Sequence, residues 1–128
     1  MQFPMRSLAA VALGGAIGAT LRWFVGSIQD IDPGRWPWPT LFVNVVGCLL
    51  IGVAVNRIER RSLRWDAIVT GLLGGFTTMS SFAIELNDMV DLGRPGTAIA
   101  YGGATLASAA AALAVGIMMG HRRTEPPA

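Results

Sequence analysis

The chain has 128 residues, of which 52% are apolar and only 14% are charged, and its mean hydropathy is +0.51. A soluble domain carries about a quarter charged residues to cover its surface, so this composition excludes a water-soluble globular fold. All ten basic residues are arginine, which excludes a phosphate-binding ATPase loop, because that loop needs a lysine. The formal net charge is only +2 and the arginines lie mostly in loops, so nucleic acid is not an expected partner.

Four apolar stretches follow one another along the chain. One contains Arg22 as its only charged residue and the others contain none; they cover residues 8–28, 36–56, 67–84 and 95–120. Each is close to the ~20 residues that an α-helix needs to cross a hydrocarbon core about 30 Å thick. The first stretch has some features of a signal peptide, but a signal peptide precedes a soluble domain, and three further apolar stretches follow here.

We therefore expect one all-α integral membrane domain over residues 1–128. It would hold four transmembrane helices at about residues 5–28, 40–57, 67–90 and 97–120, followed by a disordered tail at 121–128. Both termini and the loop after the second helix then lie on one side of the membrane. That side holds seven arginines, whereas the other side holds only Arg35 and Arg94. By the positive-inside rule, both termini are expected in the cytoplasm.

The third apolar stretch contains a sequence that weakens a helix. Residues 71–78 read Gly-Leu-Leu-Gly-Gly-Phe-Thr-Thr, which places Gly74 and Gly75 close to the β-branched Thr77 and Thr78. Each glycine costs a helix roughly 1 kcal/mol relative to alanine. Irregular backbone persists at membrane depth only where it is buried in protein or lines a wet cavity, and its free carbonyls can hold an ion. We predict a helix break near residues 74–78.

Polar side chains at membrane depth are costly and often mark functional positions. Asn44, in the second helix, has two interpretations: a hydrogen bond that joins two helices, or a pore-lining donor for an anion. The third helix carries four hydroxyls within residues 77–81, which offer donors for an anion or oxygen ligands for a cation. Met79 and Phe82 are three residues apart, so we expect them to share one face of this helix.

The other polar groups at membrane depth lie in the first, third and fourth helices. Tyr101, Thr105 and Ser108 recur at helical spacing and form one polar stripe on an alanine-rich helix. Arg22 and Glu85 are the two charged residues near membrane depth. Either could reach the interface by snorkelling, Arg22 more easily because its aliphatic stem is long.

We expect no catalytic residues. The single histidine, His121, lies in the tail, and the sequence shows neither a metal-ligand cluster nor a nucleophile beside a base. It also lacks a close pair of carboxyl groups that would suggest acid–base chemistry. The sequence therefore indicates transport or a structural role rather than an enzyme.

Three segments resemble the motifs of the CrcB/Fluc family of fluoride channels. Residues 14–23 read Gly-Gly-Ala-Ile-Gly-Ala-Thr-Leu-Arg-Trp, similar to the family's Gly-Gly…Gly-Ala…Arg-aromatic motif. Residues 40–47 read Thr-Leu-Phe-Val-Asn-Val-Val-Gly, similar to its Gly-Thr-Leu…Asn…Gly motif, with Pro39 in place of the usual glycine. Residues 74–82 read Gly-Gly-Phe-Thr-Thr-Met-Ser-Ser-Phe, followed by Glu85, similar to Gly-Gly-x-Thr-Thr-Phe-Ser-Thr-Phe with a following Glu. The resemblance covers essentially all four spans, and three motifs in this order are specific.

The resemblance implies a function and an assembly. It implies a fluoride-selective channel in a bacterial cell membrane that gives passive fluoride efflux and resistance to fluoride toxicity. The family fold is an antiparallel dimer of four-helix subunits, with two narrow pores and a sodium ion buried at the two-fold axis. The implied partners are therefore fluoride, the lipid bilayer and a second, inverted subunit.

The resemblance also implies roles for particular residues. The implied fluoride pore is lined by side chains of the second, third and fourth helices, namely Asn44, Met79, Ser80, Ser81, Phe82, Tyr101 and Thr105. Asn44 would donate to the dehydrated anion, and Phe82 would offer its ring edge, where the aromatic quadrupole is positive. The backbone carbonyls of Gly74 and Thr77 would bind sodium. The roles of Arg22, Glu85 and Ser108 stay open.

Two features depart from the family pattern. Met79 stands where the family has the first phenylalanine of an aromatic pair, and it fills a similar volume without a ring edge. Members that insert in both orientations need nearly balanced loop charges, and seven arginines against two are not balanced. We hypothesise that this subunit inserts in one orientation and pairs with an inverted paralogue, whereas a homodimer is the family default.

Two other functions stay open at this point. A small four-helix, proton-coupled multidrug exporter needs a carboxylate embedded in its first helix, and the first apolar stretch has none. A structural membrane subunit without conduction would use the same polar residues only to hold its helices together. Fluoride efflux from liposomes separates a channel from both.

Overall fold

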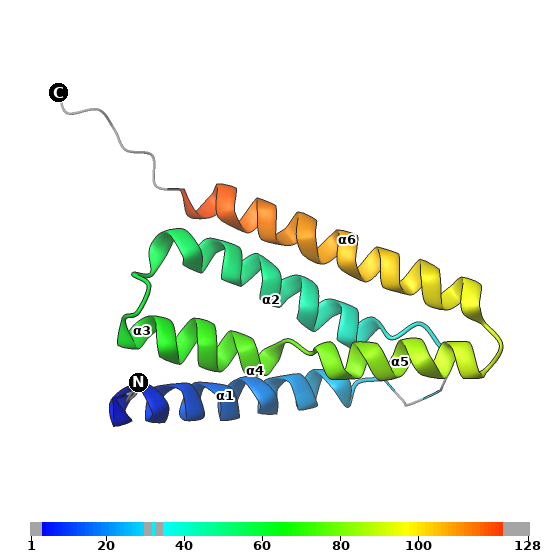
Figure 1. Ribbon diagram of the computed structural model, residues 1–128, viewed down its shortest axis with the longest axis horizontal. Coiled ribbons are helices and arrows are strands. Elements are labelled where there is room, and N and C mark those ends of the chain that lie inside the picture. The colour runs from blue at the N-terminus through cyan, green and yellow to red at the C-terminus, as the bar shows by residue number, and fades with distance from the viewer. Residues whose placement is uncertain (1–3, 30–31, 33–34, 122–128) are drawn as a thin grey trace.

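Four long helical segments alternate in direction along the chain in the computed structural model, which describes residues 4–29, 32 and 35–121 (Figure 1). The segments are α1 (Met5–Gly26), α2 (Trp38–Arg57), a composite third segment and α6 (Pro95–Gly120). Within the described ranges all four segments are long and apolar enough to cross a membrane, which confirms the predicted all-helical, four-span fold. Of the tail predicted to be disordered, residues 122–128 lie outside the described residues.

The third segment is divided into four pieces. It consists of α3 (Leu63–Trp65), the π-helical η1 (Asp66–Leu73), α4 (Gly74–Phe76) and α5 (Met79–Asp91). Thr77 and Thr78 lie between α4 and α5 in extended conformations, with ψ values of 157° and 121°. The helix break predicted from the glycines and threonines is therefore present, and Figure 1 shows it as the straight stretch between the ribbons of α4 and α5.

Glycines bring α1 into backbone contact with η1 and α4. A Cβ atom added to Gly18 would overlap the carbonyl oxygen of Leu72, and one added to Gly14 would overlap that of Ala67. On the opposite side of this seam, an added Cβ at Gly71 would lie 3.1 Å from the Cα of Gly14. Without a hydrophobic force between helices in lipid, such close approach supplies the packing energy.

A second seam of the same kind joins α2 to α6. A Cβ atom added to Gly116 would overlap the carbonyl oxygen of Leu49 and lie 3.0 Å from the Cα of Gly52. One added to Gly120 would lie 2.8 Å from the carbonyl oxygen of Val53. The glycine pair of the last helix, Gly116 and Gly120, therefore serves close packing against α2.

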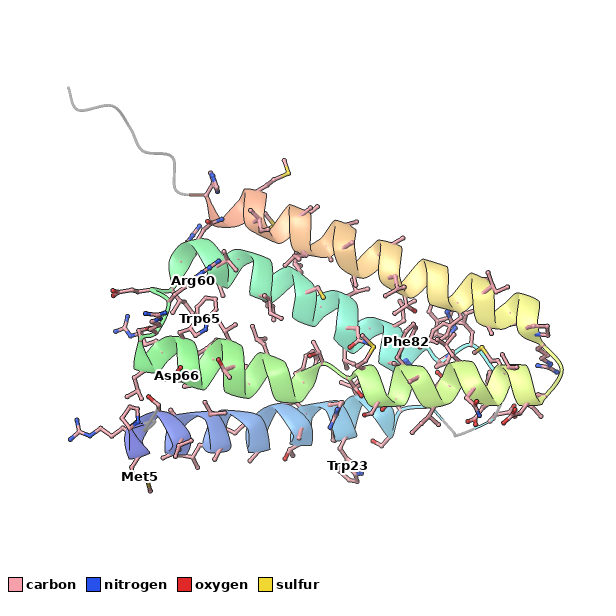
Figure 2. All side chains as sticks on the ribbon, in the orientation of Figure 1. Met5, Trp23, Arg60, Trp65, Asp66 and Phe82 are labelled. Atoms are coloured by element: carbon pink, nitrogen blue, oxygen red, sulfur yellow. The ribbon has the colours of Figure 1, made fainter. Side chains whose placement is uncertain are left out.

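The outer surface of the bundle is apolar. Large side chains on α1 and α6, including Leu13, Phe24, Ile99 and Met118, are exposed. Trp23 is also exposed and points away from the bundle in Figure 2. In a soluble protein such a surface would be unstable, whereas in a bilayer it meets lipid or another membrane helix.

Candidate functional site: the break in the third segment

Asn44 of α2 is paired with the backbone at the break. Its Nδ2 donates to the carbonyl oxygen of Thr78 at 3.0 Å, and its Oδ1 accepts from the Thr78 N–H at 2.8 Å. Both bonds satisfy backbone groups that the extended conformation removes from the helix ladder. Of the two interpretations of Asn44, the hydrogen bond between two membrane segments is present, and the second N–H of the same amide stays available.

Arg22 of α1 approaches the neighbouring carbonyl. Its Nη1 donates to the carbonyl oxygen of Thr77 at 3.4 Å, longer than a usual N–H···O hydrogen bond. Snorkelling to the interface was open to this side chain, but in the structure it turns inward, because the freed carbonyl at the break provides a polar partner inside the bundle. Arg22 and Asn44 therefore contact consecutive residues of the break from two different helices.

The hydroxyl run after the break forms the start of α5. Thr78 is the N-cap of this helix, and its Oγ1 accepts from the Ser81 N–H at 3.1 Å. The same oxygen lies 3.1 Å from Ser81 Oγ and 3.3 Å from Ser80 Oγ. A capping hydroxyl of this kind stabilises a helix by about 1 kcal/mol. The hydroxyls of Ser80 and Ser81 are thus gathered around one threonine at the break.

Phe82 lies in a small aromatic cluster on the next turn of α5. Its exposed fraction is 7%, and its ring centroid lies 5.6 Å from that of Tyr101 in α6. Trp36, from the segment before α2, packs edge-on against Tyr101 at 5.4 Å and 81°. Figure 2 shows Phe82 on the side of α5 that faces the rest of the bundle. The ring of Phe82 is therefore held in a defined orientation.

Glu85 joins three helices beside this cluster. Its Oε1 accepts from Thr40 Oγ1 of α2 at 2.5 Å, and its Oε2 accepts from the Tyr101 hydroxyl of α6 at 2.7 Å. The carboxylate therefore does not snorkel to the interface either, because two hydroxyl donors are within reach inside the bundle. The Tyr101 hydroxyl, predicted to line the pore, is engaged with Glu85 within one subunit.

The remaining members of the polar stripe on α6 differ from one another. Thr105 is buried, with an exposed fraction of 3%, and among the described residues its Oγ1 has no hydrogen-bond partner. Ser108 donates back to the carbonyl oxygen of Ala104 at 2.6 Å, as serines in membrane helices often do. Thr105 therefore keeps an unused donor, whereas the hydroxyl of Ser108 is satisfied by its own helix.

Met79 does not join the aromatic cluster. Its exposed fraction is 70%, against 7% for Phe82, so within one subunit the face that the two residues are expected to share is covered only at Phe82. Met79 is the first residue of α5, directly after the extended backbone, and within one subunit little protein covers its side chain. A contact between Met79 and an ion would require a surface outside this subunit.

A cavity of about 840 Å³ lies between α1, the segment before α2, and α5. Charged groups at its wall include Arg22, Arg35 and Glu85, and the hydroxyl residues Ser80 and Ser81 also line it. In the part of the chain that the structure describes, Asn44, Phe82 and Tyr101 are not among its lining residues. The structure thus brings four of the seven predicted pore residues into two adjacent groups: Ser80 and Ser81 at the cavity, and Phe82 with Tyr101 in the aromatic cluster.

Comparison with known proteins shows the family. The chain matches the family described as "CrcB-like protein, Camphor Resistance (CrcB)" over residues 9–117. The chain belongs to the CrcB family. It is 40% identical to the fluoride-specific ion channel FluC of Bordetella bronchiseptica, over 91% of this chain and 93% of the relative. It is 41% identical to the protein of that name from Agrobacterium fabrum, over 91% and 97%.

A third CrcB relative is more similar over a shorter part of its length. The chain is 45% identical to the fluoride-specific ion channel FluC 2 of Streptomyces avermitilis over 77% of this chain, and it spans 65% of that relative. These findings confirm the family resemblance seen in the three motifs. The relatives are named as ion channels, which are not enzymes, in agreement with the prediction from the sequence.

Three residues take part in the site of this CrcB chain but were not among the predicted site residues. Thr78 supplies the backbone partner of Asn44, Thr40 donates to Glu85, and Trp36 packs on Tyr101. Thr40 lies four residues before Asn44 on the same face of α2, and this spacing was a signal in the sequence that Thr40 belongs to the site. Trp36 lies before α2 in an irregular segment, so no helical spacing could have linked it to Tyr101.

Proposed function

We propose that this chain is the subunit of a fluoride-selective channel that gives passive fluoride efflux and protects the cell from fluoride. The observation that carries the proposal is the match to relatives named as fluoride-specific ion channels, at 40% and 41% identity over 91% of the chain. The physics of the site favours a small dehydrated anion but does not name it. Fluoride holds its hydration shell tightly, so a selective path needs closely spaced donors in a narrow, uncharged tube.

The donors for such an anion are an amide, hydroxyls and a ring edge. The second N–H of Asn44 and the unused hydroxyl of Thr105 would donate directly. Phe82 would present its positive ring edge, and its burial against Tyr101 fixes the ring at low entropic cost. Ser80 and Ser81 would form the entry from the wet cavity. The Tyr101 hydroxyl is bonded to Glu85, so Tyr101 would position neighbouring groups rather than bind the anion itself. Glu85 and Arg22 would likewise fix the positions of the helices around the path.

We propose an antiparallel dimer with a second, inverted subunit. One subunit leaves Gly74 and Met79 exposed at and next to the break, although this segment lies at membrane depth. Polar backbone facing lipid is costly, so a protein surface should cover the break. Met79 would then face a pore wall of the partner, which makes its replacement of the family phenylalanine a change at the interface.

We propose that the backbone around Gly74 holds a sodium ion at the axis of this dimer. The Thr78 N–H, which would bond the Gly74 carbonyl in a continuous helix, donates to Asn44 instead. A Cβ atom added to Gly74 would meet only the Val69 carbonyl oxygen, at 3.8 Å, so the space beside it is open. Carbonyls of Gly74 and Thr77 from two subunits would give four oxygen ligands of the kind that unwound membrane helices offer to sodium. Bound there, the ion would link the two broken helices.

We propose that both termini lie in the cytoplasm, as the arginine distribution predicts. Seven arginines against two would fix one orientation, so an inverted paralogue is the favoured partner and a homodimer the alternative. A reporter fused to the C-terminus tests this. A reporter signal only from the cytoplasmic side is expected, and equal signals from both sides would contradict the fixed orientation.

Fluoride efflux tests the function itself. The protein, with its inverted paralogue if it has one, is reconstituted in liposomes loaded with potassium fluoride, and valinomycin starts the efflux measured by a fluoride electrode. The parent should release fluoride and retain chloride. Phe82→Ile and Asn44→Asp should slow release by at least about tenfold, because each removes a buried donor from the path. Leu106→Ile, on the exposed face of α6, is the matched control and should release fluoride at the parent rate.

The alternative functions are separate outcomes of this experiment. A structural subunit would release no fluoride in any composition. A proton-coupled exporter would need a pH gradient to move its cargo and would show no electrogenic fluoride current. Either outcome, or unchanged efflux in both variants, would contradict the channel.

A further inference from the structure

The carbonyl of Gly74 is free because of a side chain on another helix. In a continuous α-helix this carbonyl accepts from the N–H four residues later, which belongs to Thr78. Here the Thr78 N–H donates to Oδ1 of Asn44 at 2.8 Å. The amide oxygen of Asn44 therefore takes the donor that the Gly74 carbonyl would otherwise have.

Asn44 also determines which carbonyl cannot bind an ion. Its Nδ2 donates to the Thr78 carbonyl oxygen at 3.0 Å, so that oxygen is engaged within the subunit. The Thr77 carbonyl accepts only the long bond from Arg22, at 3.4 Å. The amide of Asn44 thus has two effects at the break. It occupies the Thr78 carbonyl with a hydrogen bond, and it leaves the Gly74 carbonyl without its helical donor.

A second contact one turn along α2 fixes the position of the break. Gly47 lies three residues after Asn44, and a Cβ atom there would overlap Cγ2 of Thr77. The Oγ1 of Thr77 donates to the carbonyl oxygen of Leu73 at 3.0 Å, which holds this side chain against the end of η1. α2 therefore contacts both extended residues of the break, Thr77 by close packing and Thr78 by two hydrogen bonds.

We propose that Asn44 is the positioning residue of the sodium site, in addition to serving the anion. Its acceptor oxygen keeps the helix open and the Gly74 carbonyl free, whereas its remaining N–H faces the anion path. The inference rests on the proposed function, because it assumes that the carbonyls of Gly74 and Thr77 hold sodium. One amide then couples the geometry of the cation site to that of the pore.

The two roles of Asn44 are separated by two variants. Asn44→Asp keeps an oxygen that accepts from the Thr78 N–H, but it loses the donor and adds a negative charge. Asn44→Leu has a similar shape and removes both bonds, so the Thr78 N–H can return to the Gly74 carbonyl. The readout for sodium is the thermal unfolding of the detergent-solubilised dimer, titrated with sodium chloride against N-methylglucamine chloride at constant ionic strength. Fluoride efflux is measured on the same preparations.

The expected results differ between the variants. Asn44→Asp should lose fluoride efflux and keep the parent's sodium midpoint within about threefold, whereas Asn44→Leu should lose efflux and raise the midpoint by about tenfold or more. Phe82→Ile is the control, since it should lose efflux without a change in the sodium midpoint. If Asn44→Leu gives no dimer, Asn44→Ala replaces it, because removing atoms adds no bulk at the contact between α2 and α5.

Three outcomes would overturn the inference. The unfolding temperature of the parent could be independent of sodium. Asn44→Leu, or its replacement, could have the same sodium midpoint as the parent, or Asn44→Asp could lose the sodium response. Failure of the proposed function is recognised separately, because a parent that releases no fluoride can still show a sodium-dependent unfolding temperature. Sodium response and fluoride efflux are thus independent readings of the same samples.

Discussion

The two halves of the bundle, on either side of the break at residues 77–78, are held together by different means. In the half that contains α3, η1 and α4, glycines bring backbones into direct contact, as at Gly18 against Leu72 and at Gly116 against Leu49. In the half that contains α5, helices meet through large side chains and hydroxyls, as in the Tyr101–Glu85–Thr40 network. We call these the glycine half and the polar half.

The difference explains how a chain this small can hold an ion path. In lipid, packing and hydrogen bonds rather than hydrophobic burial drive helix association, and close backbone contact gives the strongest packing per residue. The glycine half is joined mainly by close backbone contact, to which Asn56 and Arg57 add hydrogen bonds at the end of α6. The polar half can therefore keep irregular backbone, an unused hydroxyl at Thr105 and a cavity of about 840 Å³ without separating the helices.

The largest expected effect comes from breaking the glycine half. Gly116→Ala places a methyl group against the backbone of α2 at Leu49 and Gly52, and neither can move without shifting the helix. We expect a loss of about 3 kcal/mol or more in stability, because overpacking against backbone cannot be relieved by side-chain rotation. Thermal unfolding in detergent measures it. Gly103→Ala, in the same helix with no atom within 4 Å of the added group, should be neutral or stabilising by about 1 kcal/mol. Equal losses in both variants would contradict the distinction.

A smaller effect is expected in the polar half. Tyr101→Phe removes the hydroxyl that donates to Glu85 at 2.7 Å but keeps the ring contacts with Phe82 and Trp36. Losing one donor to a half-buried carboxylate should cost about 1–3 kcal/mol. Thr40→Val removes the other donor at nearly constant volume. A double-mutant cycle of the two, followed by thermal unfolding, should show coupling, because both hydroxyls serve one carboxylate. Strict additivity would mean that the network is not shared.

The glycine half can be read from the sequence because its signals are local. Four-residue glycine spacing and charge-free stretches of about 20 residues depend only on the chain itself. The same holds for the break, where Gly74, Gly75, Thr77 and Thr78 disfavour a helix at one place. For these features, the position of a residue along one helix is enough to predict which face it lies on or where the helix ends.

The polar half could be predicted only as a set of residues, not as an arrangement. For Arg22 and Glu85 the sequence left snorkelling open, because spacing along one helix does not show which partners another helix provides. Their partners, Thr77 for Arg22 and Thr40 for Glu85, lie 55 and 45 residues away in the sequence. Met79 and Phe82 differ in burial for a similar reason, since helical periodicity gives an angle around the axis but not what packs against it.

The smallest effect on stability is expected at Met79, whose side chain little protein covers within one subunit. Met79→Phe restores the aromatic residue of the family, and because the side chain is 70% exposed in the subunit, stability should change by about 0.5 kcal/mol or less. The added ring edge should raise the fluoride-to-chloride efflux ratio by ~2- to 10-fold if a partner completes the pore there.

Met118→Phe makes the same change at a methionine that is 75% exposed near the far end of α6, and it should leave the ratio unaltered. An equal rise in both variants would show that the gain comes from general hydrophobicity rather than from the pore. A large loss of stability in Met79→Phe alone would show that the partner packs tightly on this position and excludes an anion from it. The ratio and the stability together therefore distinguish a pore wall from a simple subunit contact at the break.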